Sequence, residues 1–277
     1  MNEILTAVIP VVIIGIVCAA VLVIASKLMA VKEDKRFFEI RECLPGANCG
    51  ACGYAGCDGY AKALCENADV KTNLCVPGGD SVSKQISGVL GVEYSEVMKY
   101  TAVVHCGGDC TCTNDKAYYE GIKSCEGAKL LYGGKEKCIY GCIGLGDCMN
   151  VCPHNAICIK NGVAFIDADD CVGCGLCVKT CPNGLISLVP DTDRVIVTCS
   201  NKDKGALTKK VCDNGCIGCK KCERSCTKGA VKVTDNCAVI DYEKCVGCPD
   251  FAVCAEVCSS KCITVDKRNK ETENKNQ

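Results

Sequence analysis

The chain has 277 residues, of which 32 are cysteine and only 5% aromatic, and its formal net charge is −1. This charge excludes a strongly basic nucleic-acid binder, and the scarcity of aromatic residues argues against large apolar cores. So much cysteine leaves two interpretations, a disulfide framework or metal ligation, and the redox state of the compartment decides between them.

The first residues predict a transmembrane anchor over 1–28. No charged residue occurs from Ile4 to Ala25, and a helix of this length would span roughly 33 Å. A cleavable secretory signal is the alternative, but no basic residue precedes the segment and no clear cleavage site follows it. The lysines that come after it predict a single-pass protein of the cell membrane with the bulk of the chain on the cytoplasmic side. A reducing cytoplasm argues against disulfides.

A charged linker over 29–42 is predicted to lead into a membrane-proximal 4Fe-4S module over 43–80. Its motif CGACGYAGC is completed, after 17 intervening residues, by a fourth cysteine, which gives the set Cys49, Cys52, Cys57 and Cys75. Thiolate sulfur is the ligand that iron–sulfur clusters require. A zinc site is the alternative, but the second cysteine pair does not have CxxC spacing. A connecting segment with extra cysteines follows over 81–137.

The remainder contains an internal repeat with an offset of 74 residues. GCIG at 141–144 returns at 215–218, and VAFID ending at Asp167 returns as CAVID ending at Asp241. Seven cysteines recur with them: Cys125, Cys138, Cys142, Cys148, Cys152, Cys171 and Cys174 return as Cys199, Cys212, Cys216, Cys222, Cys226, Cys245 and Cys248. The repeat predicts two tandem ferredoxin-like units, over 138–190 and 199–265, each with two 4Fe-4S clusters and strands in its apolar segments. The predicted fold class is α+β: one N-terminal transmembrane helix, a small helical module and these two units.

In the first unit, CVGCGLCVKTCP at 171–182 is the full ferredoxin run, in which the fourth cysteine ligates the other cluster. One predicted ligand set is therefore Cys152, Cys171, Cys174 and Cys177. The partner run GCIGLGDCMNVCP has Leu145 where its middle cysteine is expected. The other set is therefore Cys142, Cys148 and Cys181, and Cys138 is the nearest candidate for the missing fourth ligand.

The second unit supplies two further sets by the same exchange rule. They are Cys216, Cys219, Cys222 and Cys258, and Cys226, Cys245, Cys248 and Cys254. The second run departs from the usual motif by a three-residue insertion after Cys248. Five clusters are expected in all.

The remaining cysteines leave one question open. Cys138 and its repeat mate Cys212 recur even though the set beside Cys212 already contains Cys219. A sixth cluster is therefore an alternative, in which Cys106, Cys110 or Cys112 joins Cys125 and Cys138, and Cys199 and Cys212 belong to the same question. Cys237 and Cys262 align with Val163 and Leu185, so both are predicted to be small buried hydrophobic residues.

Basic residues concentrate in the second unit: Lys202, Lys204, Lys209, Lys210, Lys220, Lys221 and Arg224. They are either a solvated face or a docking patch for an acidic electron carrier. The chain has no dinucleotide fingerprint, phosphate loop or recognisable catalytic frame, so no catalytic residue is predicted. The tail over 266–277 is polar and is predicted to be disordered.

The N-terminal helix, CGACGYAGC with Cys75, the stretch YGGKEKCIYGCIGLGDCMNVCPHNAI and the tandem ferredoxin motifs together resemble the B subunit of the Rnf complex, in its longer form. The resemblance covers nearly the whole chain except the tail. It implies an electron-transfer subunit of a ferredoxin:NAD+ oxidoreductase coupled to Na+ or H+ translocation. Soluble ferredoxin would be the electron donor, and other membrane and flavin- or NAD-carrying subunits would be the partners. A membrane-tethered polyferredoxin subunit of another oxidoreductase, a hydrogenase or dehydrogenase, is the alternative.

Overall fold

The computed structural model describes residues 2–28, 34–192, 194–248 and 252–266. The segment predicted as an anchor forms one helix, α1 (Asn2–Leu28). Within the described ranges, no helix has the length and apolar character that crossing a membrane requires, and the single-span prediction is therefore not supported.

A three-helix module follows, built from α2 (Lys35–Cys43), α3 (Gly56–Glu66) and α4 (Gly79–Leu90). Helix α2 occupies part of the segment predicted as a charged linker. It begins there because the Asp34 carboxylate caps it, accepting a hydrogen bond from the Arg36 nitrogen at 3.0 Å. It is held by burial of Ile40, which packs in one core with Tyr60 and Ile86.

The first repeat unit contains α5 (Cys125–Leu130), α6 (Asp147–Asn150), β2 (Ile157–Lys160), β3 (Val163–Ile166), α7 (Leu176–Thr180) and β4 (Ile186–Pro190). β2 and β3 form the predicted hairpin, with Asn161 and Gly162 both at positive φ in its turn. The sequence did not predict β1 (Tyr100–Val104), which lies in the connecting segment and pairs antiparallel with β4, from Tyr100↔Pro190 to Val104↔Ile186.

The second unit repeats this plan with β5 (Arg194–Val197), α8 (Gly205–Val211), α9 (Lys221–Ser225), β6 (Val231–Thr234), β7 (Cys237–Ile240), α10 (Tyr242–Cys245), α11 (Val253–Glu256) and β8 (Ile263–Asp266). β6 and β7 form the predicted hairpin, and β5 pairs antiparallel with β8, as β1 does with β4. The insertion after Cys248 and the tail from residue 267 lie outside the described residues.

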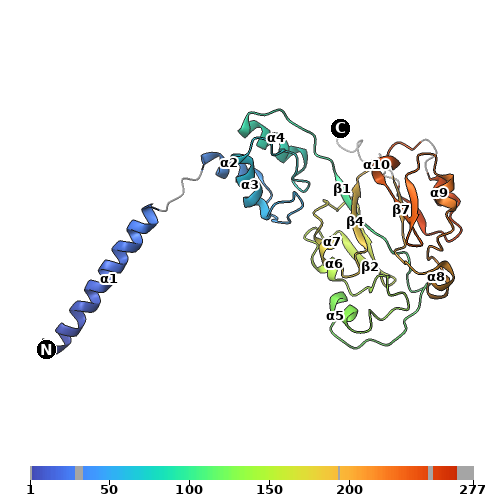
Figure 1. Ribbon diagram of the computed structural model, residues 1–277, viewed down its shortest axis with the longest axis horizontal. Coiled ribbons are helices and arrows are strands. Elements are labelled where there is room, and N and C mark those ends of the chain that lie inside the picture. The colour runs from blue at the N-terminus through green and yellow to red at the C-terminus, as the bar shows by residue number, and fades with distance from the viewer. Residues whose placement is uncertain (1, 29–33, 193, 249–251, 267–277) are drawn as a thin grey trace.

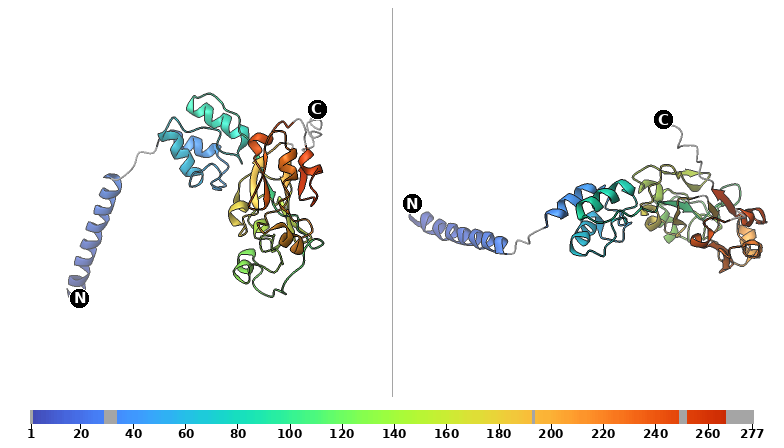
Figure 2. Two further views of the ribbon diagram at one scale, coloured as in Figure 1. Left: turned by 45° about the vertical axis from the view of Figure 1, so that its right-hand side comes forward. Right: turned by 90° about the horizontal axis from the view of Figure 1, so that it is seen from above.

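The three folded parts lie in a row, with the first unit between the helical module and the second unit (Figures 1 and 2). Two polar residues, His105 and Arg194, make contacts that connect the two units. His105 follows β1, and its ring nitrogens bond the Val197 carbonyl at 2.8 Å and the Ser187 hydroxyl at 2.7 Å. Arg194, only 2% exposed, pairs with Asp266 at 2.7 Å and with Asp191 at 3.6 Å. Partly buried polar contacts therefore connect the two units.

Candidate iron–sulfur centres

The complete ferredoxin run of the first unit surrounds one cavity of about 340 Å³. The four thiols that line it are the predicted set: Cys152, Cys171, Cys174 and Cys177. The Ala102 nitrogen donates a hydrogen bond to the Cys171 sulfur at 3.4 Å, so β1 contributes to this centre. Burial raises the pKa of Cys177 to about 11, and the charges of Cys171, Cys174 and Cys152 add to the shift.

The incomplete run surrounds a second cavity, of about 370 Å³, and here the structure differs from the sequence prediction. Its four thiols are Cys125, Cys142, Cys148 and Cys181. Cys125 occupies the place predicted for Cys138, because α5 is tied to α6: Ser124 Oγ donates to Asp147 Oδ2 at 2.9 Å, one residue before Cys148. Burial raises the pKa of Cys148 to about 12, with further contributions from the charges of Cys142, Cys125 and Cys181.

In the second unit, a cavity of about 390 Å³ is lined by Cys226, Cys245, Cys248 and Cys254, as predicted. The Ala230 nitrogen donates to the Cys226 sulfur at 3.3 Å. Burial raises the pKa of Cys254 to about 11, and the charges of Cys245 and Cys226 add to it. The three-residue insertion therefore leaves these four thiols together.

The last predicted set of this unit is gathered around Cys222. Burial raises the pKa of Cys222 to about 11, and the charges of Cys216, Cys258 and Cys219 add to the shift. Cys219 is exposed, unlike the other nineteen predicted ligands.

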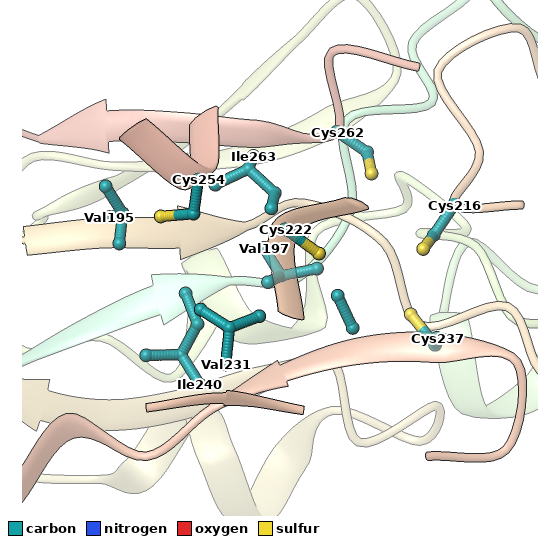
Figure 3. Packing of buried hydrophobic residues seen from close by; sticks show 11 residues of the cluster. Val195, Val197, Cys216, Cys222, Val231, Cys237, Ile240, Cys254, Cys262 and Ile263 are labelled. Carbon is teal, nitrogen blue, oxygen red and sulfur yellow. The ribbon is translucent and has the colours of Figure 1, made fainter. Parts of the chain in front are cut away.

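Two further sulfurs border this set, at one end of the core of the second unit (Figure 3). Cys237 and Cys262 are buried, as their repeat mates predicted. They are not merely apolar, however: hydrogen bonds to Cys199 and Cys216 raise the pKa of the Cys237 thiol, and a bond to Cys216 raises that of Cys262. The Cys237 sulfur donates to the Cys199 carbonyl oxygen at 3.2 Å, and the Cys262 sulfur lies 3.6 Å from the Cys258 sulfur.

The membrane-proximal set gathers in the α2–α4 module. Burial raises the pKa of Cys75 to about 11, and the charges of Cys57, Cys52 and Cys49 add to the shift. The Cys57 nitrogen donates to the Asn48 side chain at 2.8 Å, which fixes the start of α3. The backbone is close to the thiols in this module, since a Cβ on Gly78 would lie 3.1 Å from the Cys75 sulfur.

Cys138 lines a different cavity, between the two units, together with Cys106, Cys199 and Cys212. Cys110 and Cys112 line neither this cavity nor the other three that are rich in cysteine. The sequence contained one signal for this arrangement, the recurrence of Cys125 and Cys138 as Cys199 and Cys212.

The donor sets fit iron–sulfur clusters. The cavities each present four thiols around an apolar space, and backbone N–H groups donate to several of the sulfurs. Among the described residues, no group of three or more His, Cys, Asp or Glu side chains forms a site for a single metal ion. Four thiols around one cavity are the ligand set that a four-iron cluster requires.

Contacts also link the helical module to the first unit. Lys179 Nζ donates to the Cys49 carbonyl at 3.1 Å. Burial raises the pKa of Cys174, and the charge of Cys49 is among the neighbours that raise it further. The membrane-proximal set therefore adjoins the set of Cys174.

A duplicated ferredoxin-like fold with this many cysteine-lined cavities defines a multicluster electron-transfer protein, and comparison with known proteins agrees. The family described as "Putative Fe-S cluster" matches residues 44–77, and the family described as "4Fe-4S binding domain" matches residues 164–187. The chain therefore binds several [4Fe–4S] clusters.

The relatives define the family more closely. The chain is 42% identical over 265 residues to the B subunit of the proton-translocating ferredoxin:NAD(+) oxidoreductase complex of Clostridium ljungdahlii, covering 95% of this chain and 92% of that protein. It is 38% identical to the B subunit of the Na(+)-translocating complex of Acetobacterium woodii, over 91% of this chain and 75% of that protein. It is 39% identical to the B subunit of the ion-translocating oxidoreductase complex of Methanosarcina acetivorans, over 90% and 94%. The chain belongs to the family of B subunits of ion-translocating oxidoreductase complexes, and is an electron-transfer subunit.

Proposed function

We propose that this chain accepts electrons from reduced soluble ferredoxin and passes them to membrane redox subunits of an ion-translocating ferredoxin:NAD+ oxidoreductase, whose flavin- and NAD-carrying subunits are its partners. One observation carries the proposal: cysteine sets adjoin one another along the row of folded parts, from the exposed Cys219 to the module that holds Cys49. This order describes a conduction path. In it, five clusters are held by the predicted sets, with Cys125 in the place of Cys138.

The surface around Cys219 supports ferredoxin as the donor. The seven basic residues of the second unit are all exposed, on and beside α8 and α9. Two apolar side chains are exposed among them, Leu207 at 51% and Ile217 at 36%. Lys202 pairs with Asp235 at 3.9 Å and Lys209 with Asp213 at 3.4 Å. Exposed basic and apolar side chains on the same segment fit an acidic protein that must bring its own cluster close to a cysteine ligand.

Helix α1 supports membrane association. The large apolar side chains described on it, from Ile9 to Ile24, are all exposed. A helix that is apolar all round needs an apolar environment. In the proposal α1 attaches the chain to the cell membrane as a single pass, and lysines after it keep the folded parts on the cytoplasmic side.

The docking surface is tested by stopped-flow reduction of the purified holoprotein with reduced ferredoxin. Lys221→Glu should lower the association rate several-fold at low salt, and the difference should vanish at high salt because exposed charges are then screened. Lys123→Glu is the matched control: it makes the same charge change at an exposed position just before α5, away from the second unit's sequence. Equal rates for the two variants, or no dependence on salt in the unmodified protein, would remove ferredoxin from this surface.

The direction of flow is tested by freezing the protein after addition of limiting reduced ferredoxin. The clusters of the second unit should be reduced first and the membrane-proximal one last. Reduction of the membrane-proximal cluster in a variant whose second-unit ligands are replaced by serine would contradict this order.

A further inference from the structure

We propose that a sixth [4Fe–4S] cluster lies between the two ferredoxin units, held by Cys106, Cys138, Cys199 and Cys212. This cluster would carry electrons between the two units, and in this role it rests on the proposed electron-transfer function. Its ligands come from the connecting segment, from the first unit and from the second unit.

The first argument is the cavity. It measures about 410 Å³, close to the 340–390 Å³ of the three cavities lined by ligand sets, and it presents four thiols of its own. Cys142 also borders it, but the Cys142 thiol is grouped with Cys125 and Cys181 in the neighbouring cavity. Cys138, Cys199 and Cys212 line this cavity together. Burial raises the pKa of Cys212 to about 11, and the charges of Cys138, Cys199 and Cys112 add to the shift; Cys112 lies beside the cavity without lining it, and its sulfur accepts a hydrogen bond from the Asn214 side chain at 2.9 Å.

The second argument is the polar groups that face the sulfurs. Asn201 is 2% exposed, and its side-chain nitrogen and backbone nitrogen donate to Cys138 and Cys199, both at 3.5 Å. The Cys142 and Cys216 nitrogens donate to the Cys106 and Cys199 sulfurs at 3.3 and 3.2 Å. Hydrogen bonds of this kind favour the thiolate form that binds iron.

The third argument is the broken symmetry of the repeat. Cys125 and Cys199 are repeat mates, but only the first unit lacks a middle cysteine, at Leu145. Cys125 therefore completes the cluster of its own unit. In the second unit Cys219 occupies that position, which leaves Cys199 free to join Cys138 and Cys212.

The hydrogen bonds define what this cluster would connect. Cys142 and Cys216 belong to the sets on either side, and each donates its backbone N–H to a sulfur of the intervening site. An electron crossing from the second unit would reduce the intervening cluster by one electron and then leave it for the first unit. Ligation itself replaces four S–H bonds by four Fe–S bonds and releases the four protons.

The ligands are tested by iron and sulfide analysis of the full chain, isolated without oxygen, in four single variants: Cys106→Ser, Cys138→Ser, Cys199→Ser and Cys212→Ser. Each should lose one four-iron cluster and the same paramagnetic-resonance signal. Cys112→Ser, beside the site, and Cys158→Ser, at an exposed position of strand β2, are matched controls that should lose none. Unchanged iron in Cys138→Ser and Cys212→Ser would overturn the proposal.

Native mass spectrometry of the unmodified protein gives an answer that does not depend on how the variants fold. Six clusters are expected, and five would overturn the proposal. Failure of this proposal can be distinguished from failure of the proposed function. Five clusters together with reduction by ferredoxin would refute only the sixth cluster between the units. Six clusters without reduction by ferredoxin would remove only the donor.

Discussion

Single cysteine positions decide which thiols of this chain meet. Cys125 lines a cavity with Cys142 although 16 residues separate them in sequence, because Ser124 bonds Asp147 beside Cys148. Proximity in sequence favoured Cys138, but the structure places that residue on the other side of Cys142. Cysteine spacing predicts which residues are candidate ligands. It does not predict which distant cysteine completes an incomplete set, because that depends on hydrogen bonds that position the intervening loop.

The assignment of Cys125 can be tested by loss and rescue. Cys125→Ser should remove one four-iron cluster, and adding Leu145→Cys should restore it, because the second unit already uses a cysteine at that repeat position, Cys219. Iron content and the paramagnetic-resonance spectrum are the measurements, and Cys158→Ser is the control. Full iron content in Cys125→Ser alone would return the fourth position to another thiol.

A second prediction concerns Cys237, whose sulfur donates to the Cys199 carbonyl oxygen at 3.2 Å and whose pKa is raised by hydrogen bonds to the Cys199 and Cys216 side chains. Its repeat mate is Val163, so Cys237→Val introduces a side chain that this fold accepts at the same place. Hydrogen bonds to cluster sulfurs are one determinant of reduction potential. The variant should keep all its iron, and a cluster of the second unit should shift to a more negative potential in a redox titration. Loss of a cluster would instead make Cys237 a ligand.

At the scale of elements, local strands were predictable and distant pairings were not. The β2–β3 and β6–β7 hairpins follow from apolar segments separated by Asn161-Gly162 and Asp235-Asn236. The β1–β4 and β5–β8 pairs join strands that are 82 and 66 residues apart, counting from Val104 to Ile186 and from Val197 to Ile263. No local pattern encodes a partner that far away, so β1 was left in a connecting segment.

The approach of β1 to a ligand loop gives a test of that pairing. A Cβ on Gly173 would lie 2.3 Å from the Tyr100 carbonyl oxygen, whereas one on Gly184 meets nothing within 4 Å. Both glycines have positive φ, +66° and +61°. Gly184→Ala should therefore cost only the about 1–2 kcal/mol of a left-handed residue. Gly173→Ala carries that strain plus a backbone clash.

Thermal unfolding without oxygen, with iron retention measured alongside, separates the two variants. Gly173→Ala should unfold at a clearly lower temperature than Gly184→Ala. It should also lose the cluster whose predicted ligands include Cys171 and Cys174. An equal decrease in unfolding temperature and in iron retention in the two variants would contradict this prediction. It would mean that the strained backbone dihedral accounts for the whole effect and that β1 moves away from the added Cβ at no cost in stability.

At the scale of the whole molecule, several of the predicted ligands also belong to the core. Cys216, Cys222 and Cys254 are buried with Val195 and Val231 in the second unit. Cys148 and Cys177 are likewise buried in the apolar core of the first unit, with Ile157 and Ile186. Each sheet formed by the described strands has two strands, and such pairs are at best marginally stable by themselves. We therefore expect bound clusters to supply much of the free energy of folding of both units.

The α2–α4 module differs, because Ile40, Tyr60, Leu64 and Ile86 form an apolar core beside its thiols. Oxidative removal of all clusters from the full chain should therefore abolish hydrogen-exchange protection in the four strand pairs while some protection persists in α3 and α4. Exchange measured segment by segment, before and after removal, distinguishes the parts within one sample. Strand pairs that stayed protected without iron would show that apolar packing alone keeps them folded. The clusters would then not be required for the stability of the two units.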